Sequence, residues 1–173
     1  AVLFSSHPPA AVVRVGKHFT GLFLIAYLMT FAGLTKQMPH GGRWLLLLLT
    51  TVWFGDTGAY FIGKTFGRHK LAPLVSPNKT WEGAIGGLFA SMGAGALAMF
   101  YVPDLPLMVA LPLSVLLGLM GQFGDLAESL VKRAYNVKDS GNLIPGHGGV
   151  WDRIDAVIFA APILFAYLHM AYS

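Results

Sequence analysis

The chain contains no cysteine and few charged residues. Without cysteine it can form no disulfide, no thiolate metal site and no cysteine nucleophile, so any metal must bind oxygen or imidazole ligands. Charged residues make up only 12% of the 173 residues, whereas soluble domains carry about 25%. A soluble domain of this length would need a larger polar shell. These shortages argue against a soluble domain and favour a protein that lies in a membrane.

Hydrophobic residues make up 55% of the chain and gather in five long runs, and the mean hydropathy is +0.61. A helix that spans a bilayer needs about 20 mostly apolar residues, with about 17 as a lower limit. A soluble bundle of buried helices is the alternative, but polar faces at the helical period are nearly absent. The sequence therefore predicts an all-α, polytopic integral membrane protein with about five transmembrane helices. They are expected over residues 18–34, 44–63, 83–101, 106–122 and 154–172.

Lysine and arginine gather in alternate connections between the apolar runs. Ten of the twelve fall on one side, and only Lys36 and Arg43 fall on the other. Because positively charged loops stay in the cytosol, the two long polar loops should face the cytosol and the C-terminus should lie outside. The basic residues occupy loops and do not follow one helix face, so nucleic acid is not an expected partner.

The first residues show no signal peptide, because they lack an initiator methionine and a basic leading region, and two prolines interrupt them. We interpret residues 1–17 as a leading cytosolic segment, the remnant of a longer N-terminal region. Residues 18–173 are expected to form one transmembrane catalytic domain, and the two long cytosolic loops are expected to carry its chemistry.

Asp56 lies inside the second apolar run. An ionisable side chain at membrane depth is costly, so a functional role is the default interpretation. The alternative is a structural pairing with a basic residue of a neighbouring helix. Both interpretations stay open at the level of the sequence.

The longer polar loop and its flanks read GDLAESLVKRAYNVKDSGNLIPGHGGVWDRID over residues 124–155. Residues 125–133 lack glycine and proline and are expected to be helical. Asp125, Ser129 and Lys132 or Arg133 then fall near one helix face, at steps of three and four.

Glycines surround His147 in the segment PGHGG at 145–149, where backbone N–H groups could cradle phosphate oxygens. Asp152 and Asp155 follow, one helical turn apart. Carboxylates, basic residues and a glycine nest indicate phosphate chemistry assisted by a hard cation. Mg²⁺ usually takes one or two protein carboxylates, and Asp125 and Asp152 are the candidates. Two close carboxylates would repel each other without a cation between them.

Residues 129–155 resemble the signature of the phosphatidate cytidylyltransferases, also called CDP-diacylglycerol synthases. That signature has a serine, Lys-Arg, Lys-Asp, Pro-Gly-His-Gly-Gly, Asp-Arg and a final aspartate. The matching positions are Ser129, Lys132, Arg133, Lys138, Asp139, Pro145, Gly146, His147, Gly148, Gly149, Asp152, Arg153 and Asp155.

A second block, WFGDTGAYFIGKTFGRHKLAPLVSPNKTWEG over residues 53–83, resembles the central region of that family. Asp56 and Tyr60 share a helix face, and a basic rim follows them. Residues 76–80 are expected to form a turn, in which Lys79 could contact phosphate and Thr80 could cap the next helix. Each of these residues could instead have a purely structural role.

The resemblance implies that CTP and phosphatidate react to give CDP-diacylglycerol and pyrophosphate at a bacterial cytoplasmic (inner) membrane, with the active site facing the cytosol. It implies Mg²⁺ on Asp125 and Asp152, with room for a second, monovalent cation, and catalytic roles for these two acids with Lys132 and Arg133. The bilayer and both substrates are the expected partners, and a homodimer stays open. Substrate binding is expected at Ser129, Lys138, Asp139, Gly146, His147, Gly148, Gly149, Arg153, Asp155, Asp56 and Lys79.

Two other functions remain as alternatives. A transporter could use Asp56 and Asp125 as ion sites at broken helices, although the chain shows no paired internal repeat. A CTP-dependent lipid kinase would share the membrane and the nucleotide. A serine hydrolase built on Ser129 and His147 would lack the nucleophile-elbow sequence. The products separate these classes, since a synthase releases pyrophosphate, a kinase releases CDP and a transporter releases neither.

Overall fold

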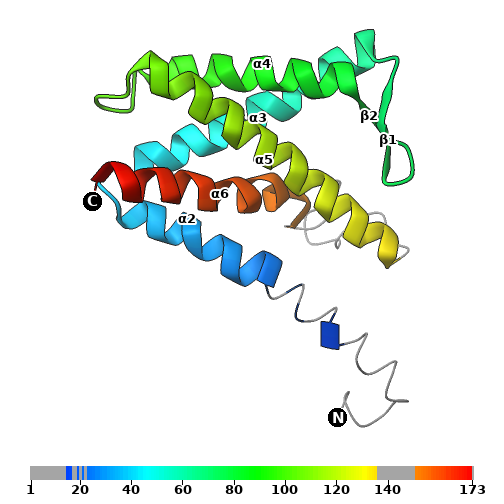
Figure 1. Cartoon of the computed structure of the whole chain (residues 1–173), viewed down its shortest axis with the longest axis horizontal. Coiled ribbons are helices and arrows are strands. Elements are labelled where there is room, and N and C mark those ends of the chain that lie inside the picture. Colours follow the sequence, from blue (N-terminus) through cyan, green and yellow to red (C-terminus); the bar gives the residue numbers. More distant parts are fainter. Residues whose placement is uncertain (1–14, 17–18, 20, 22, 136–150, 173) are drawn as a thin grey trace.

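The chain folds into a helical bundle with one β-hairpin at its edge (Figure 1). The structure is a computed structural model that describes residues 15–16, 19, 21, 23–135 and 151–172, without the side chains of 24 and 151–153. The elements are the π-helix η1 (Phe23–Tyr27), α2 (Leu28–Gln37), α3 (Gly41–Phe66), β1 (Lys70–Ala72), β2 (Ser76–Thr80), α4 (Trp81–Ala98), α5 (Leu107–Ala134) and α6 (Trp151–Tyr172).

Within the described residues, three helices are long and apolar enough to cross a membrane. They are α3, α5 and the part of α6 over Ile154–Tyr172. The fold is thus consistent with the predicted helical membrane protein. The first expected run, 18–34, lies partly outside the described residues, and the third, 83–101, corresponds to α4, which is not among the three. The count of five spanning helices therefore stays a prediction.

Helix α5 is longer than its apolar run. The polar residues 125–133, expected to be helical, continue the helix without a break and bring it to 28 residues. At about 1.5 Å per residue α5 is about 42 Å long, whereas the hydrocarbon core of a bilayer is about 30 Å thick. Its C-terminal turns can therefore project beyond the hydrocarbon, with Lys132 and Arg133 in the last turn, where they complement the helix dipole.

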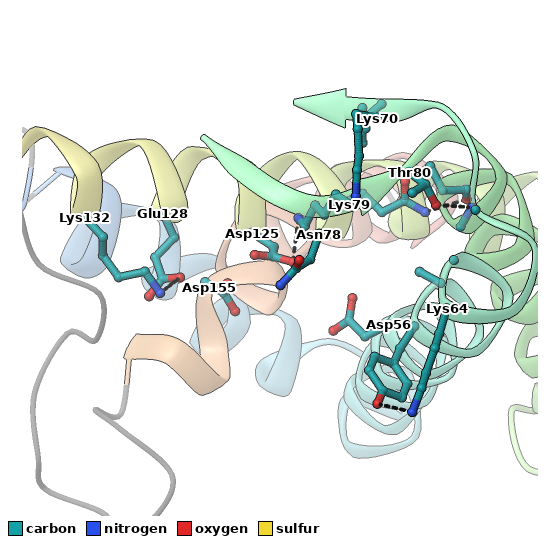
Figure 2. Close-up of a pocket in the computed structure, with 18 residues that line it drawn as sticks. Asp56, Lys64, Lys70, Asn78, Lys79, Thr80, Asp125, Glu128, Lys132 and Asp155 are labelled. Carbon is teal, nitrogen blue, oxygen red and sulfur yellow. Dashed lines mark hydrogen bonds and ion pairs between the residues drawn. The ribbon is translucent and has the colours of Figure 1, made fainter. Parts of the chain in front are cut away.

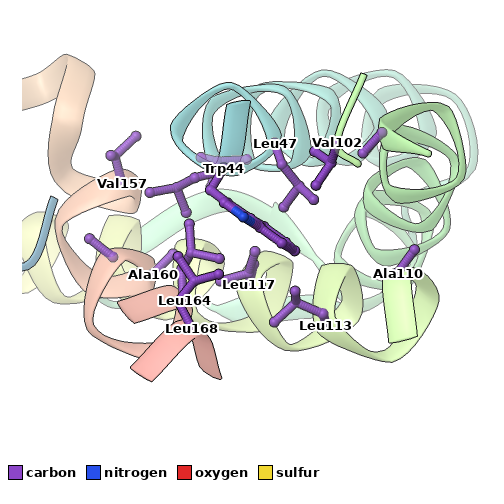
Figure 3. Close-up of a cluster of buried hydrophobic side chains, with 14 of the residues drawn as sticks. Trp44, Leu47, Val102, Ala110, Leu113, Leu117, Val157, Ala160, Leu164 and Leu168 are labelled. Atoms are coloured by element: carbon purple, nitrogen blue, oxygen red, sulfur yellow. The ribbon is translucent and has the colours of Figure 1, made fainter. Parts of the chain in front are cut away.

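The hydrophobic core lies mainly in the part of the bundle away from the hairpin. It joins the first half of α3 and the first half of α5 to residues 156–168 of α6, through side chains such as Trp44, Leu117 and Leu164 (Figure 3). Trp44 also packs on Tyr167, with ring centroids 5.7 Å apart. The polar halves of the same three helices meet at the opposite end of the bundle.

Helices α3 and α4 pack closely because glycines line their contact. A Cβ atom at Gly87 would lie 2.8 Å from the carbonyl oxygen of Gly55, closer than side chains approach backbone atoms. Small residues allow such close packing between helices in membranes. The Ser91 hydroxyl adds a hydrogen bond to the carbonyl oxygen of Thr51, at 3.0 Å.

The connection from α3 to α4 is an antiparallel hairpin in which Lys70 pairs with Thr80 and Ala72 pairs with Ser76. The prediction of a turn over residues 76–80 was wrong, because these residues form β2 and the reversal comes before them. The other described elements are helices, which is consistent with the predicted all-α class. The predicted cap on the next helix is confirmed, since the Thr80 hydroxyl accepts a hydrogen bond from the backbone N–H of Gly83 at 3.1 Å.

Thr80→Ala is expected to destabilise the protein by about 1 kcal/mol, because it removes the side-chain cap of α4. Thr80→Ser keeps the hydroxyl and serves as the control. Thermal unfolding in detergent, followed by tryptophan fluorescence, should place the alanine variant below both the wild type and the serine variant. Equal midpoints for all three proteins would contradict a capping role.

Candidate active site

A pocket of about 720 Å³ opens at the polar end of the bundle, between α3, the hairpin, α5 and α6. Four acidic side chains and four lysines line it. Figure 2 shows Asp56 pointing from α3 toward the side of the pocket that carries Asp125 and Asp155. The lining acids are Asp56, Asp125, Glu128 and Asp155, and the lining lysines are Lys64, Lys70, Lys79 and Lys132.

Three of the four acids form a tight cluster. Asp125, Glu128 and Asp155 each offer a carboxylate oxygen, and these oxygens lie within 4.8 Å of one another. Asp125 and Glu128 stand one turn apart on α5, while Asp155 comes from the first turns of α6. We call these three residues the acidic cluster.

Gly124 explains why α6 brings Asp155 so close. A Cβ atom at Gly124 would lie 2.7 Å from the Asp155 carbonyl oxygen and 2.9 Å from the Phe159 ring. Only a glycine at this position lets the α6 backbone pass directly beside α5. The neighbouring residue in the chain is Asp125, so the close helix contact also sets the spacing of the acids.

Two lysines balance part of the negative charge. The Lys79 ammonium lies 2.6 Å from a carboxylate oxygen of Asp125, and the Lys132 ammonium lies 2.7 Å from one of Glu128. Glu128 and Asp155 are buried, while Asp125 is half-buried and faces the pocket. Three carboxylates against two paired lysines leave oxygen ligands that suit a hard cation such as Mg²⁺.

The structure describes the side chain of only one of the two predicted metal ligands. Asp125 belongs to the acidic cluster, but the side chain of Asp152 lies outside the described residues. Asp155, expected to bind substrate, stands beside Asp125. Glu128 was missed by the sequence reasoning, although its spacing of three from Asp125 and four from Lys132 on a helix pointed to the same face.

Some of the other predicted residues line the pocket, some do not, and some lie outside the described residues. Lys132, Lys79 and Asp56 line the pocket, no described basic residue forms a salt bridge with Asp56, and the catalytic and binding roles of all three stay predictions. Arg133 instead donates from Nε to the Val75 carbonyl oxygen of the hairpin at 3.3 Å, and Ser129 is not among the lining residues. The predictions that lie outside the described residues are Lys138, Asp139, Gly146, His147, Gly148, Gly149 and the side chain of Arg153.

Glu82 fixes the hairpin at its base. Its carboxylate accepts hydrogen bonds from the backbone N–H groups of Arg68 and His69, at 3.1 and 3.2 Å, and lies 2.6 Å from Nδ1 of His69. Glu82 stands in the first turn of α4, just before the apolar run. This contact holds the chain that leaves α3 against the start of α4, and with it the hairpin wall of the pocket.

The Glu82 contact predicts a pH dependence of stability. The hydrogen bond from His69, helped by those from backbone N–H groups, lowers the pKa of Glu82 from 4.5 to about 2. Because the pKa is lower in the folded state, the contribution of Glu82 to stability is complete above about pH 4.5 and is lost as the pH falls toward about 2. Glu82→Gln should lower the thermal midpoint near neutral pH and should remove part of the acid-induced decrease. Identical pH profiles of the midpoint for both proteins would contradict this role.

Known proteins resemble this chain over nearly its whole length. The sequence profile of the cytidylyltransferase family matches residues 3–171. The phosphatidate cytidylyltransferase of Staphylococcus aureus (strain COL) is 45% identical over 146 residues, which are 83% of this chain and 56% of that protein. The phosphatidate cytidylyltransferase of Brucella suis biovar 1 (strain 1330) is 44% identical over 149 residues, which are 85% of this chain and 55% of that protein. The chain thus spans about half the length of the curated relatives it matches.

Proposed function

This chain belongs to the cytidylyltransferase family, and from that premise we propose that it converts CTP and phosphatidate to CDP-diacylglycerol and pyrophosphate. The observation that carries the proposal is the acidic cluster with its two paired lysines, set in a pocket at one end of membrane-type helices. A lipid phosphate can reach such a pocket from the bilayer, and a nucleotide can reach it from water.

The protein itself needs to form few covalent bonds in this reaction. A phosphate oxygen of phosphatidate attacks the α-phosphorus of CTP, and a new P–O bond forms as the bond to the bridging oxygen of the β-phosphate breaks. Pyrophosphate leaves with that oxygen and its electron pair. Catalysis of this kind consists mainly of alignment and of charge neutralisation, which lysines and a cation on a rigid helix framework can provide.

The acidic cluster fits a divalent cation by its donor set, since three carboxylates converge there and, among the described residues, two lysines form salt bridges with them. Asp125, Glu128 and Asp155 would hold Mg²⁺ there, with Asp152 as a further candidate and with space for a second, monovalent cation. Bound Mg²⁺ would supply charge neutralisation on the phosphate oxygens of CTP.

Lys79 and Lys132, which form salt bridges with acids of the cluster, would also contact the phosphates of the substrate. Lys79 and Lys132 neutralise Asp125 and Glu128 in the structure. With a cation held by the acidic cluster, Lys79 and Lys132 would be available to contact the triphosphate. The lysines then stabilise charge on pyrophosphate as it leaves. The segment at residues 145–149 would add backbone N–H donors, as the sequence predicts.

The decisive experiment is an assay of the chain purified in detergent, with phosphatidate, CTP and Mg²⁺. Formation of CDP-diacylglycerol together with pyrophosphate would support the proposal. Release of CDP with a phosphorylated lipid would instead assign a CTP-dependent kinase. Absence of both, with ion uptake in proteoliposomes, would assign a transporter.

We also propose that the pocket faces the cytosol at a bacterial inner membrane. Single cysteines introduced into the cysteine-free chain beside Arg68, at the pocket end, and beside Asp104, at the core end, should label from opposite sides of the membrane. In intact cells an impermeant maleimide should reach only the position near Asp104. Labelling of both positions from outside would overturn the orientation. Cross-linking of the purified protein would test the homodimer.

A further inference from the structure

The four lysines of the pocket fall into two kinds. Lys79 and Lys132 are ion-paired with acids of the cluster. Lys64 and Lys70 line the same pocket, but no carboxylate among the described residues lies within 4.0 Å of their ammonium groups. Figure 2 shows Lys64 on the α3 side of the pocket, apart from Glu128 and Lys132. Two walls of the pocket, α3 with Lys64 and the hairpin with Lys70, therefore each carry a lysine that no acid among the described residues neutralises (Figure 2).

Lys64 stands where a spanning helix reaches the membrane surface. It lies in the last turn of α3, and its ammonium lies 5.5 Å from the centroid of the Tyr60 ring and 3.4 Å from the Tyr60 hydroxyl. The side chains of Tyr60 and Phe61 are 60% and 61% exposed, and their rings are in contact. Exposed aromatic rings beside a lysine at the end of a spanning helix are typical of the headgroup level of a bilayer.

The charge distribution decides which phosphate suits which part of the pocket. A phosphomonoester carries a charge of about −1.5 to −2 near neutral pH, so the acidic cluster repels it unless a cation is present. Lys64 and Lys70 attract it directly, and the Tyr60 hydroxyl can donate a hydrogen bond beside Lys64. A triphosphate that arrives with its divalent cation is instead suited to the cluster.

We propose that Lys64 with Tyr60, from the α3 wall, and Lys70, from the hairpin wall, receive the phosphomonoester headgroup of a membrane lipid between them. The inference rests on the proposed function for the identity of that lipid as the nucleophilic substrate. Lys79 and Lys132 then belong to the nucleotide side of the pocket. The lipid headgroup enters along the exposed aromatic end of α3, so its acyl chains can stay in the bilayer.

The first test measures binding without turnover. The 173-residue chain in detergent is mixed with phosphatidate, with phosphatidylglycerol or with phosphatidylcholine, and bound lipid is counted by native mass spectrometry. The wild type should prefer phosphatidate. Lys64→Gln and Lys70→Gln should each weaken that preference by about tenfold, as expected for a lost charge-assisted hydrogen bond. Lys36→Gln, at the opposite end of the bundle, should leave it unchanged.

The second test separates the lipid phosphate from the nucleotide phosphates. In the turnover assay both variants should raise KM for phosphatidate by about tenfold, with KM for CTP within about twofold of the wild type. A rise in KM for CTP alone would place these lysines on the nucleotide side and overturn the proposal. Unchanged lipid preference in both variants would overturn it as well.

The two proposals fail in different ways. If the wild type makes no CDP-diacylglycerol, the proposed function fails, and the binding test alone decides on the lipid site. The glutamine variants are expected to fold, because neither lysine has an acid partner among the described residues, and their thermal midpoints check this. If a glutamine variant does not fold, Lys64→Met and Lys70→Met replace it, since they keep the apolar stem.

Discussion

Asp125→Asn is expected to lower the rate of CDP-diacylglycerol formation by about 100-fold or more, because a metal ion contributes several kcal/mol to phosphoryl chemistry and about 1.4 kcal/mol corresponds to tenfold in rate. The substitution keeps the size of the side chain but removes the charge from the acid of the cluster that forms the salt bridge with Lys79. Glu128→Gln and Asp155→Asn should show losses of the same kind. The measurement is initial rate against Mg²⁺ concentration.

Asp104→Asn is the control for the loss of an acid, since Asp104 lies in the connection between α4 and α5 at the core end of the bundle. It should retain nearly full activity. The thermal midpoint of Asp125→Asn should stay close to that of the wild type, while the rise in midpoint on addition of Mg²⁺ should disappear. Near-normal turnover of Asp125→Asn at ordinary Mg²⁺ would mean that other acids hold the cation, with Asp152 and Asp139 the next to replace.

Gly87→Val is expected to lower the stability of the fold more than Thr80→Ala or Glu82→Gln. Its Cβ atom would lie 2.8 Å from the Gly55 carbonyl oxygen, 2.9 Å from the Gln122 amide nitrogen and 3.0 Å from the Ala59 methyl group. The Gly55 oxygen belongs to the backbone of α3 and can move only if the helices separate. Overpacking of this kind costs about 1–3 kcal/mol and sometimes more, and the thermal midpoint in detergent should fall accordingly.

Gly93→Val on the same helix is the matched control. A Cβ atom at Gly93 would meet nothing within 4 Å, so the substitution should change the midpoint little. The two variants share the change in composition and in helix propensity, and they differ only in the contact with α3 and α5. Equal midpoints for Gly87→Val and Gly93→Val would contradict the packing of α3 against α4.

Much of the architecture follows from local sequence. The apolar runs predicted α3, the first part of α5 and most of α6, since hydrophobicity of this length needs no knowledge of partners. The polar helix over residues 125–133 was also predicted, but its fusion with α5 was not, because the break was placed where the charges begin. The hairpin was missed because residues 76–80 were expected to form a turn, whereas strand pairing depends on contacts between residues that are separate in the sequence.

The site was harder to predict than the fold. Asp125, Lys79 and Lys132 follow from charges at meaningful spacing, and all three line the pocket. An acid four residues before a lysine on a helix can also be an ordinary surface ion pair, so this spacing alone does not single out Glu128. The position of Asp155 beside Asp125 depends on how closely two helices approach, and that distance is set by Gly124, whose role only the folded arrangement reveals.

Because α5 runs without a break from the core to the site, we expect the site to respond to the thickness of the bilayer. Leu117 of α5 packs in the hydrophobic core. Asp125 lies about two turns further along the same helix, about 12 Å away along its axis. Spanning helices tilt to match the membrane around them. A pivot of about 5° at Leu117 would carry Asp125 and Glu128 about 1 Å past Asp56 on α3, and a displacement of that size can change rates by about 100-fold. The thickness of the bilayer would then change the rate of the reaction through the tilt of α5.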